Sequence, residues 1–193
     1  MRAFIALPLP REVQAVLSRT INQLERLCGR AVRFVPAGQI HLTVKFLGDI
    51  DEGQAPQITA GLRALVASYA PWPAQLQSKL GAFPNSSAPR VIWVGVEDGG
   101  NAVTVQRSVE DALDGFGFEQ EQRQFTPHLT LGRRRPGKDS GRLQGRAMEG
   151  VVVEPISFFF DRLVFFQSIL APSGAIHKEI SVHVLGRPLS ESV

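Results

Sequence analysis

The sequence predicts an α+β fold built on antiparallel sheets. Predicted strands and helices are mixed without the regular alternation of a doubly wound parallel sheet. No glycine-rich nucleotide-binding fingerprint follows any predicted strand. The chain has 193 residues, of which 44% are hydrophobic. This is enough to bury a sizeable core, as one domain or as two tightly joined lobes.

The first half of the chain begins with a predicted strand over residues 2–7. A helix is expected from about residue 11 to 28, because apolar residues recur there at helical spacing and Gly29 follows. Residues 40–47 alternate in polarity and predict a strand. Asp51 then suits the N-cap of a second helix that ends before Pro71.

The second half continues the mixture with strands, one helix and a loop. Its expected elements are strands over 74–83 and 90–96, a helix over 102–116, a strand over 127–134, a loop over 136–150, and long strands over 151–170 and 175–185 joined by a turn around residues 172–174. A helix thus precedes both strand 40–47 and strand 127–134, which suggests a duplicated unit.

Composition limits the function classes only weakly. The 21 basic and 18 acidic side chains give a net charge of +3, which permits an anionic ligand without requiring one. Cys28 is the single cysteine, so an internal disulfide and a four-cysteine zinc site are excluded. No apolar run approaches the roughly 18–20 residues of a membrane span. Pro8 and Pro10 interrupt the apolar start, so we expect a first strand rather than a signal peptide, and a cytoplasmic protein.

The strongest signal is a repeated triplet, His-Leu-Thr, at residues 41–43 and 128–130. With four histidines and six threonines, chance predicts about 0.1 His-x-Thr triplets in the whole chain. Residues two apart on a strand point to the same face. We therefore expect each histidine to project together with its threonine.

The same alternation places the neighbouring side chains of the first copy. Lys45 is expected on the face of His41 and Thr43, while Leu42, Val44 and Phe46 are expected to face the core.

In the second copy, Gly132 is expected beside His128 and Thr130, where it leaves room for a ligand. Strict alternation turns Arg133 away from this face, so a strand end, a twist or a bulge is needed to bring it back.

Two histidines, each beside a hydroxyl, suit metal-free cleavage of a phosphodiester. Imidazole titrates near neutrality, so one ring can act as a base and the other as an acid. Hydroxyls and a nearby cation can hold the non-bridging phosphate oxygens. The remaining two histidines, His177 and His183, lack a threonine partner and are interpreted as structural or surface residues.

These motifs resemble those of the two-histidine (2H) phosphoesterase superfamily. The segments RAFIALPLP, RFVPAGQIHLTVKFLG, LGAFPNSSAPRVIWVGV, FTPHLTLGR and RLVFFQSIL are similar, in order, to segments of the RNA 2′,3′-cyclic phosphodiesterases, also called 2′-5′ RNA ligases. The resemblance implies a bilobal α+β fold with pseudo-twofold symmetry and a central cleft lined by antiparallel sheets. It also implies that residues 1–193 form a single bilobal domain, with one His-x-Thr strand in each lobe.

The resemblance further implies hydrolysis of 2′,3′-cyclic phosphate ends to 2′-phosphomonoesters, without metal or other cofactor. His41 and His128 would be the catalytic pair, with His128 activating water and His41 protonating the leaving 3′ oxygen. Thr43 and Thr130 would bind phosphate. Arg133 matches a basic residue after the second motif and Lys45 one inside the first, and both would contact phosphate.

The expected partner is RNA or a nucleotide with a 2′,3′-cyclic phosphate, and the protein is expected to be a monomer with no membrane association. RNA ends stack on aromatic rings, although strand phenylalanines are more often core. The phenylalanines in matching segments are Phe46, Phe125, Phe165 and Phe166. Six cations that follow the second motif are either a solvated loop or an RNA contact. They are Arg133, Arg134, Arg135, Lys138, Arg142 and Arg146.

Three alternatives remain open at this point. The same site could join RNA ends by 2′-5′ ligation. The protein could instead be a non-catalytic RNA-binding module that uses residues 133–146. A metallohydrolase is disfavoured, because no carboxylate lies at ligand spacing beside either triplet.

Overall fold

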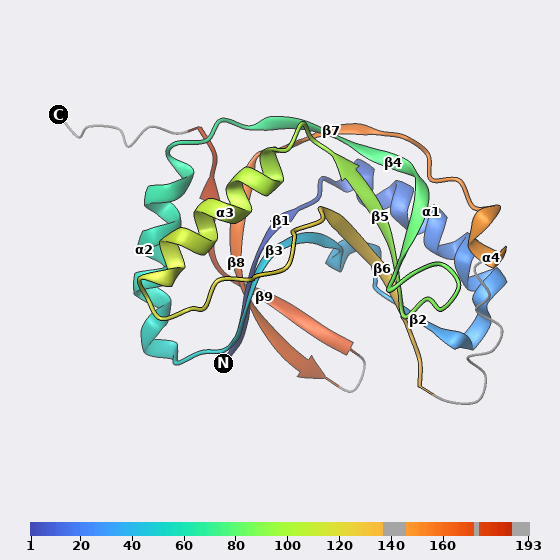
Figure 1. Cartoon of the computed structure of the whole chain (residues 1–193), viewed down its shortest axis with the longest axis horizontal. Helices are drawn as coiled ribbons and strands as arrows, with labels where there is room; N and C mark the ends of the chain where they lie inside the picture. The colour runs from blue at the N-terminus through green and yellow to red at the C-terminus, as the bar shows by residue number, and fades with distance from the viewer. Residues whose placement is uncertain (137–145, 172–173, 187–193) are drawn as a thin grey trace.

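The computed structural model describes residues 1–136, 146–171 and 174–186 (Figure 1). The strands are β1 (Arg2–Pro8), β2 (Val32–Phe34), β3 (His41–Asp49), β4 (Trp72–Phe83), β5 (Val91–Glu97), β6 (His128–Arg134), β7 (Ser157–Phe160), β8 (Arg162–Ala171) and β9 (Gly174–Val184). The helices are α1 (Arg11–Cys28), α2 (Ala55–Val66), α3 (Asn101–Asp114) and α4 (Arg146–Glu149), with 3-10 turns η1 (Gly29–Ala31), η2 (Ala37–Gln39) and η3 (Glu52–Gln54).

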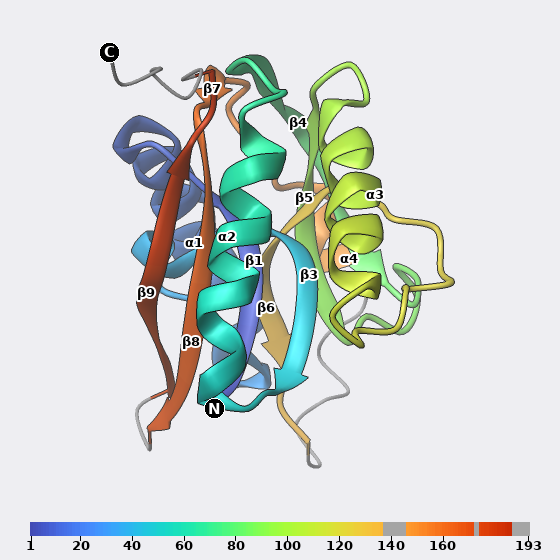
Figure 2. The ribbon, with the colours of Figure 1, turned by 90° about the vertical axis from the view of Figure 1, so that its left-hand side faces the viewer.

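The strands of the described residues join one antiparallel sheet in the order β7-β4-β5-β6-β3-β1-β8-β9, with β2 paired to β6. The α+β class with antiparallel pairing is thereby confirmed. A single residue pair, Leu42 with Leu129, connects β3 to β6 in the middle of the sheet. We call the strands on one side of this connection the β3 half (β3, β1, β8, β9) and those on the other the β6 half (β6, β5, β4, β7, β2). Figure 2 shows β3 and β6 side by side, where the two halves meet.

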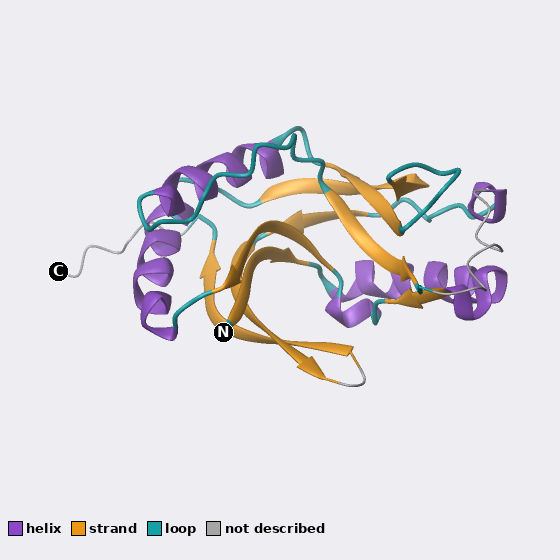
Figure 3. Cartoon of the chain, turned by 60° about the horizontal axis from the view of Figure 1, so that its bottom comes forward, coloured by secondary structure: helices purple, strands orange, loops and turns teal. Residues whose placement is uncertain are grey.

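The helices gather at two ends of the molecule, with the strands between them (Figure 3). Helices α2 and α3 pack on each other, and they contact β9 and β3 respectively. Helix α1 contacts β2 and α4 at the other end. Its apolar stripe explains this packing, because its buried residues follow the predicted three-to-four spacing. They are Val13, Val16, Leu17, Thr20, Ile21, Leu24 and Cys28.

Strand β1 is buried on both faces, and this defines two sides of the sheet. Ile5 and Leu7 belong to the main core beneath the helices. Phe4 and Ala6 alternate with them and belong to a smaller cluster with Phe166 and Val164. We call the side of Phe4 and Ala6 the site face, and the other side the helix face.

The last third of the chain differs from its predicted form. The apolar run over 151–170 is not one long strand, because it divides at Asp161 into β7 and β8. Strand β7 pairs with β4 at one edge of the sheet, whereas β8 pairs with β1 in the other half. The chain therefore crosses from one half to the other at this point.

The predicted loop over 136–150 and the predicted turn around 172–174 are described only in part. The predicted loop over 136–150 contains the short helix α4, and its residues 137–145 lie outside the described part. Residues 172 and 173 of the expected turn are likewise not described. In the described part of the chain, no helix has the length and apolar character needed to cross a membrane.

Candidate active site

The two histidines are held by the same backbone device. The Nδ1 of His41 lies 2.9 Å from the carbonyl oxygen of Gln39, and the Nδ1 of His128 lies 2.7 Å from that of Thr126. A carbonyl oxygen only accepts, so each Nδ1 carries the hydrogen and donates it. In both neutral rings the free lone pair is therefore on Nε2.

The register of β3 and β6 brings the two triplets together. Leu42 pairs with Leu129, and both are fully buried on the helix face. In an antiparallel pair the residues before and after this point are also opposite one another. Each histidine is thus set across from the threonine of the other strand, and all four side chains lie on the site face.

A bulge in β3 changes which side chains follow Thr43 on the site face. Ile5 of β1 pairs with Lys45, but the next residue, Ala6, pairs with Thr43, so Val44 is extra. An extra residue in one strand turns the side chains beyond it to the opposite face. The simple alternation used on the sequence therefore ends at Val44.

The expectation that Lys45 accompanies His41 and Thr43 is wrong for this reason. Lys45 points to the helix face, where it is 6% exposed. Its Nζ forms a buried ion pair with the carboxylate of Glu110 on α3 and donates to the carbonyl oxygen of Glu119 at 2.8 Å. Lys45 is therefore engaged inside the protein and is not part of the site.

The expectation that Phe46 faces the core is wrong as well. The same bulge turns Phe46 to the site face, where it is 69% exposed and lies 6.2 Å, between ring centroids, from Phe4. Phe165 is in the main core, whereas Phe166 lies on the site face, 6.0 Å from the ring of His41. Phe125 is partly buried against the main core.

Strand β6 has a bulge at the equivalent position. Ile92 of β5 pairs with Gly132, but Trp93 pairs with Thr130, so Leu131 is extra. This is the bulge that Arg133 needed. Arg133 is exposed on the site face, and its charge lowers the pKa of His128.

Gly132 turns inward with the bulge, and the expectation that it leaves room for a ligand is wrong. A Cβ at this position would lie 2.6 Å from Val32 and 2.9 Å from Phe34. The space beside Gly132 is therefore filled by strand β2.

Aromatic rings surround His41. Phe4 stacks on its imidazole at 4.7 Å, and His177 of β9 approaches edge-on at 5.1 Å. Burial in this cluster, followed by the charge of His177, lowers the pKa of His41 to about 4, while the bond to Gln39 opposes the shift. His41 is accordingly neutral at pH 7 in the free protein.

His177 is a site-face residue that the sequence did not reveal. Its own pKa is lowered by burial. It lies far from both triplets in the chain and reaches His41 only because β8 and β9 pair next to β1. No local motif marks such a long-range contact. His183, by contrast, is buried and lies 2.8 Å from the hydroxyl of Ser181, which fits a structural role.

Different aromatic residues surround the ring of His128. Phe83 lies edge-on to its ring at 5.0 Å, and Trp93 lies edge-on at 5.9 Å. Burial lowers the pKa of His128, the bond to Thr126 raises it, and the charge of Arg133 lowers it further.

The basic run after β6 is described only in part. Arg134 and Arg135 are exposed at the end of β6. Lys138 and Arg142 lie outside the described residues, and Arg146 begins α4. An RNA contact along the whole run is therefore still a prediction.

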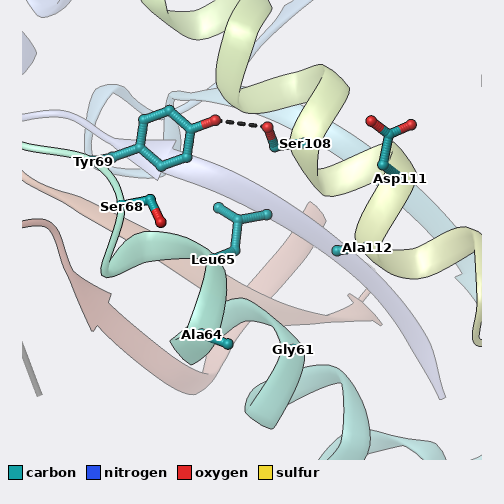
Figure 4. Close-up of a pocket in the computed structure, with 8 residues that line it drawn as sticks. All are labelled: Gly61, Ala64, Leu65, Ser68, Tyr69, Ser108, Asp111 and Ala112. Atoms are coloured by element: carbon teal, nitrogen blue, oxygen red, sulfur yellow. Dashed lines mark hydrogen bonds between the residues drawn. The ribbon is translucent and has the colours of Figure 1, made fainter.

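A surface groove lies between α2 and α3, away from the two triplets (Figure 4). Within it the hydroxyls of Tyr69 and Ser108 are 2.6 Å apart and share a hydrogen bond. None of the six residues predicted for the site lines this groove. Its lining is Gly61, Ala64, Leu65, Ser68, Tyr69, Ser108, Asp111 and Ala112.

Curated relatives match nearly the whole chain. One from Methanothermobacter thermautotrophicus is 31% identical over 182 residues, covering 94% of this chain and 97% of its own. One from Methanocaldococcus jannaschii is 29% identical over 181 residues, covering 93% and 98%. Both are named RNA 2′,3′-cyclic phosphodiesterase.

Solved structures show the same fold. The crystal structure of TT0787 of Thermus thermophilus superimposes with a TM-score of 0.79 at 26% identity, covering 96% of this chain and 98% of that one. The structure of E. coli LigT complexed with 3′-AMP has a TM-score of 0.73 at 20% identity, with the same coverage, and is a likeness of fold. Residues 11–169 match the sequence model of the 2′-5′ RNA ligase superfamily. The chain therefore belongs to the 2′-5′ RNA ligase superfamily, the two-histidine phosphoesterases that its paired His-x-Thr strands suggested.

Proposed function

We propose that this protein is an RNA 2′,3′-cyclic phosphodiesterase that hydrolyses the cyclic phosphate at RNA ends to a 2′-phosphomonoester. The observation that carries the proposal is the shared site face of the two triplets. Each His Nδ1 is anchored on a backbone carbonyl, so each Nε2 is available for proton transfer. The names of relatives about 30% identical over most of the chain support the same activity.

The proposed step is an in-line displacement at phosphorus. A water oxygen attacks the phosphorus while the Nε2 of His128 accepts its proton. The bond from phosphorus to the 3′ oxygen breaks, and the Nε2 of His41 donates a proton to that oxygen. The phosphate stays on the 2′ oxygen, and proton exchange with solvent restores both rings.

Three further residues have proposed roles in binding. The hydroxyls of Thr43 and Thr130 and the guanidinium of Arg133 hold the non-bridging oxygens and stabilise the charge that develops on them. Lys45 has no part in this proposal, because it is committed to Glu110 on the helix face.

The acid role requires His41 to gain a proton in the complex. Burial keeps this ring neutral in the free protein. An anionic phosphodiester beside the ring favours its charged form and raises its pKa. We therefore expect proton uptake by His41 when substrate binds.

Product analysis tests the proposal most directly. A 2′,3′-cyclic nucleotide or an RNA with a cyclic end is incubated with the protein, and the product is identified by phosphorus NMR. A 2′-phosphate is expected, in the presence of EDTA as in its absence. A 3′-phosphate would overturn the assigned leaving group, and loss of activity in EDTA would overturn the metal-free mechanism.

The family description also supports 2′-5′ ligation as a second activity of this site. If a 5′-hydroxyl of a second RNA takes the place of water, the same displacement forms a 2′-5′ bond. Incubating RNA halves, one with a cyclic end and one with a 5′-hydroxyl, tests for this product.

We further propose that residues 1–193 work as one bilobal unit and as a monomer, because each half of the sheet supplies one histidine of the pair. Sedimentation in the active concentration range checks the monomer. Cytoplasmic location is still a prediction, which cell fractionation checks.

A further inference from the structure

Strand β2 places a second arginine directly opposite Arg133. Arg33 of β2 and Arg133 of β6 are paired residues in the antiparallel register. Directly opposite residues project to the same face of a sheet, with Cβ atoms about 4.5–5.5 Å apart. Because the bulge at Leu131 turns Arg133 to the site face, Arg33 lies on that face too.

The pairing of residues beside the two arginines supports this placement. The neighbours Phe34 and Gly132 pair with each other and turn inward, where Phe34 packs against the main core. Alternation then sends Arg33 and Arg133 outward to the opposite side. Both arginines are exposed.

Two like charges directly opposite one another are destabilising in a sheet. In the described part of the chain, the ion pairs are Arg19 with Glu154, Lys45 with Glu110, and Arg162 with Asp161. Neither Arg33 nor Arg133 takes part in them. A second phosphate at Arg33, next to the one that Arg133 holds, would relieve this repulsion, and guanidinium binds phosphate through two parallel hydrogen bonds.

The position of Arg33 indicates which phosphate it can bind. In the described part of the chain, β2 pairs with residues 132–134 of β6, past the bulge at Leu131, so Arg33 lies one strand to the side of Arg133 and outside the rows of the two triplets. A 2′,3′-cyclic end has its scissile phosphate at the histidines. The next phosphate along the chain is necessarily on the 5′ side of the terminal nucleotide, because the 3′ side ends in the cyclic phosphate.

We propose that Arg33 binds the phosphodiester that precedes the cyclic end, beside the scissile phosphate that Arg133 holds, so that the site takes an RNA chain in preference to a cyclic mononucleotide. This inference deepens the proposed function and rests on it. It assigns Arg33, which lies outside both triplets and outside the basic run after β6, to substrate selection.

The test compares two substrates that differ by this phosphate. One is a 2′,3′-cyclic mononucleotide, and the other is a dinucleotide that ends in a 2′,3′-cyclic phosphate. For Arg33→Ala, the ratio of kcat/KM for the dinucleotide to that for the mononucleotide is expected to fall about tenfold, the loss of one charged phosphate contact. Arg26→Ala, which removes an exposed arginine on α1, is the matched control and is expected to leave the ratio unchanged.

A binding measurement separates this inference from the proposed function. The affinity for a short single-stranded RNA that ends in a 2′-phosphate is measured by fluorescence anisotropy over a range of salt concentrations. Arg33→Ala is expected to reduce the slope of log K against log salt by about 0.7, the value for one phosphate contact on a single strand. This readout holds whether or not the protein cleaves cyclic phosphates.

The outcomes divide clearly. A lower dinucleotide ratio with a smaller salt slope supports the inference, and so does partial recovery of both in Arg33→Lys. An unchanged ratio overturns it, as does an equal loss on both substrates, which would place Arg33 at the scissile phosphate. The melting temperature of Arg33→Ala is expected at or above the parent value, because a repulsion is removed, and a clear fall would assign Arg33 a structural role instead.

Discussion

The two His-x-Thr strands share a backbone and differ in their surroundings. In both, the histidine Nδ1 donates to the carbonyl two residues earlier, and a bulge follows three residues after the histidine. The residue five positions after the histidine is therefore on the site face in each strand. It is Phe46 in β3 and Arg133 in β6.

The side chains around the two histidine rings also differ between β3 and β6. His41 lies among Phe4, Phe166 and His177, whereas His128 lies beside Phe83, Trp93 and a cation. The duplicated backbone thus orients the two histidine rings in the same way, and the different side chains around each ring give the two histidines different proton affinities. One half of the sheet offers an aromatic surface, and the other adds positive charge for phosphate.

The largest expected effect comes from removing either ring. His41→Ala and His128→Ala should each lower kcat by about 10²–10⁴-fold, because a positioned acid or base is lost. A cyclic substrate with sulfur in place of the 3′ oxygen sharpens the comparison, because a thiolate leaves without a proton. It should restore much of the rate in His41→Ala and little in His128→Ala, measured by steady-state kinetics.

The opposite pattern with the sulfur substrate would exchange the roles of acid and base. A melting temperature near that of the parent protein shows that each variant is folded. Losses below tenfold in both variants would contradict the two-histidine mechanism.

The next comparison is between Lys45 and Gly132, the equivalent positions four residues after each histidine. Lys45→Met leaves the carboxylate of Glu110 buried without its cation, and it should reduce the free energy of unfolding by about 3–5 kcal/mol. Urea denaturation measures this. The double variant Lys45→Met with Glu110→Leu should lose less than the single one, and an equal or larger loss would contradict this account of the cost.

Gly132→Ala should have a smaller effect. Its Cβ would lie 2.6 Å from Val32 and 2.9 Å from Phe34, and overpacking of this kind costs about 1–3 kcal/mol. Gly115→Ala is the matched control, because no atom lies within 4 Å of a Cβ there. It should change the free energy of unfolding by less than about 0.5 kcal/mol. A Gly132→Ala protein as stable as the control would show that β2 yields easily at this point.

The smallest expected effect is a shift in pH dependence. Both histidine pKa values lie below 6.5, that of His41 at about 4, so kcat/KM should peak below pH 6.5 and decline at higher pH. The limbs of the kcat profile should lie at higher pH, because bound phosphate favours both charged rings. Because of the same lowered pKa values, these histidines bind protons at a higher pH in the unfolded chain than in the folded protein. The free energy of unfolding should therefore fall as the pH drops from about 6.5 to 4.

His177→Phe isolates the contribution of the neighbouring charge. Of the described charged groups, His177 is the one whose charge acts on His41, and phenylalanine keeps the aromatic wall while removing the charge. The pKa of His41, followed by proton NMR, should rise, while that of His128 should stay the same. A rise in the pKa of both histidines, or of neither, would contradict the conclusion that His177 acts on His41 alone.

The sequence was sufficient for the parts of the structure that depend on local pattern. Helix 11–28 and the His-x-Thr strands follow from periodicity, and the structure confirms α1, β3 and β6 close to the expected bounds. The division of 151–170 into β7 and β8 was missed, because an apolar run carries no mark of which neighbour it pairs with.

Strand alternation predicted the site as far as the threonines, and beyond them the resemblance to the family pointed to Arg133. Val44 and Leu131 resemble ordinary core residues in the sequence, yet each is an extra residue that reverses the facing of the side chains after it. Lys45 and Phe46 were misplaced for that reason. His177 was missed because its contact with His41 depends on strand pairing across most of the chain.

The two bulges determine which side chains after each triplet face the active site. If β3 ran without its bulge at unchanged length, strict alternation would send Phe46 into the core and turn Lys45 to the site face, with the triplet itself untouched. Loss of the bulge in β6 at unchanged length would withdraw Arg133 in the same way. The presence or absence of one bulge in either strand thus decides which side chains line the site, and a duplicated scaffold of this kind could exchange those side chains while keeping its catalytic pair.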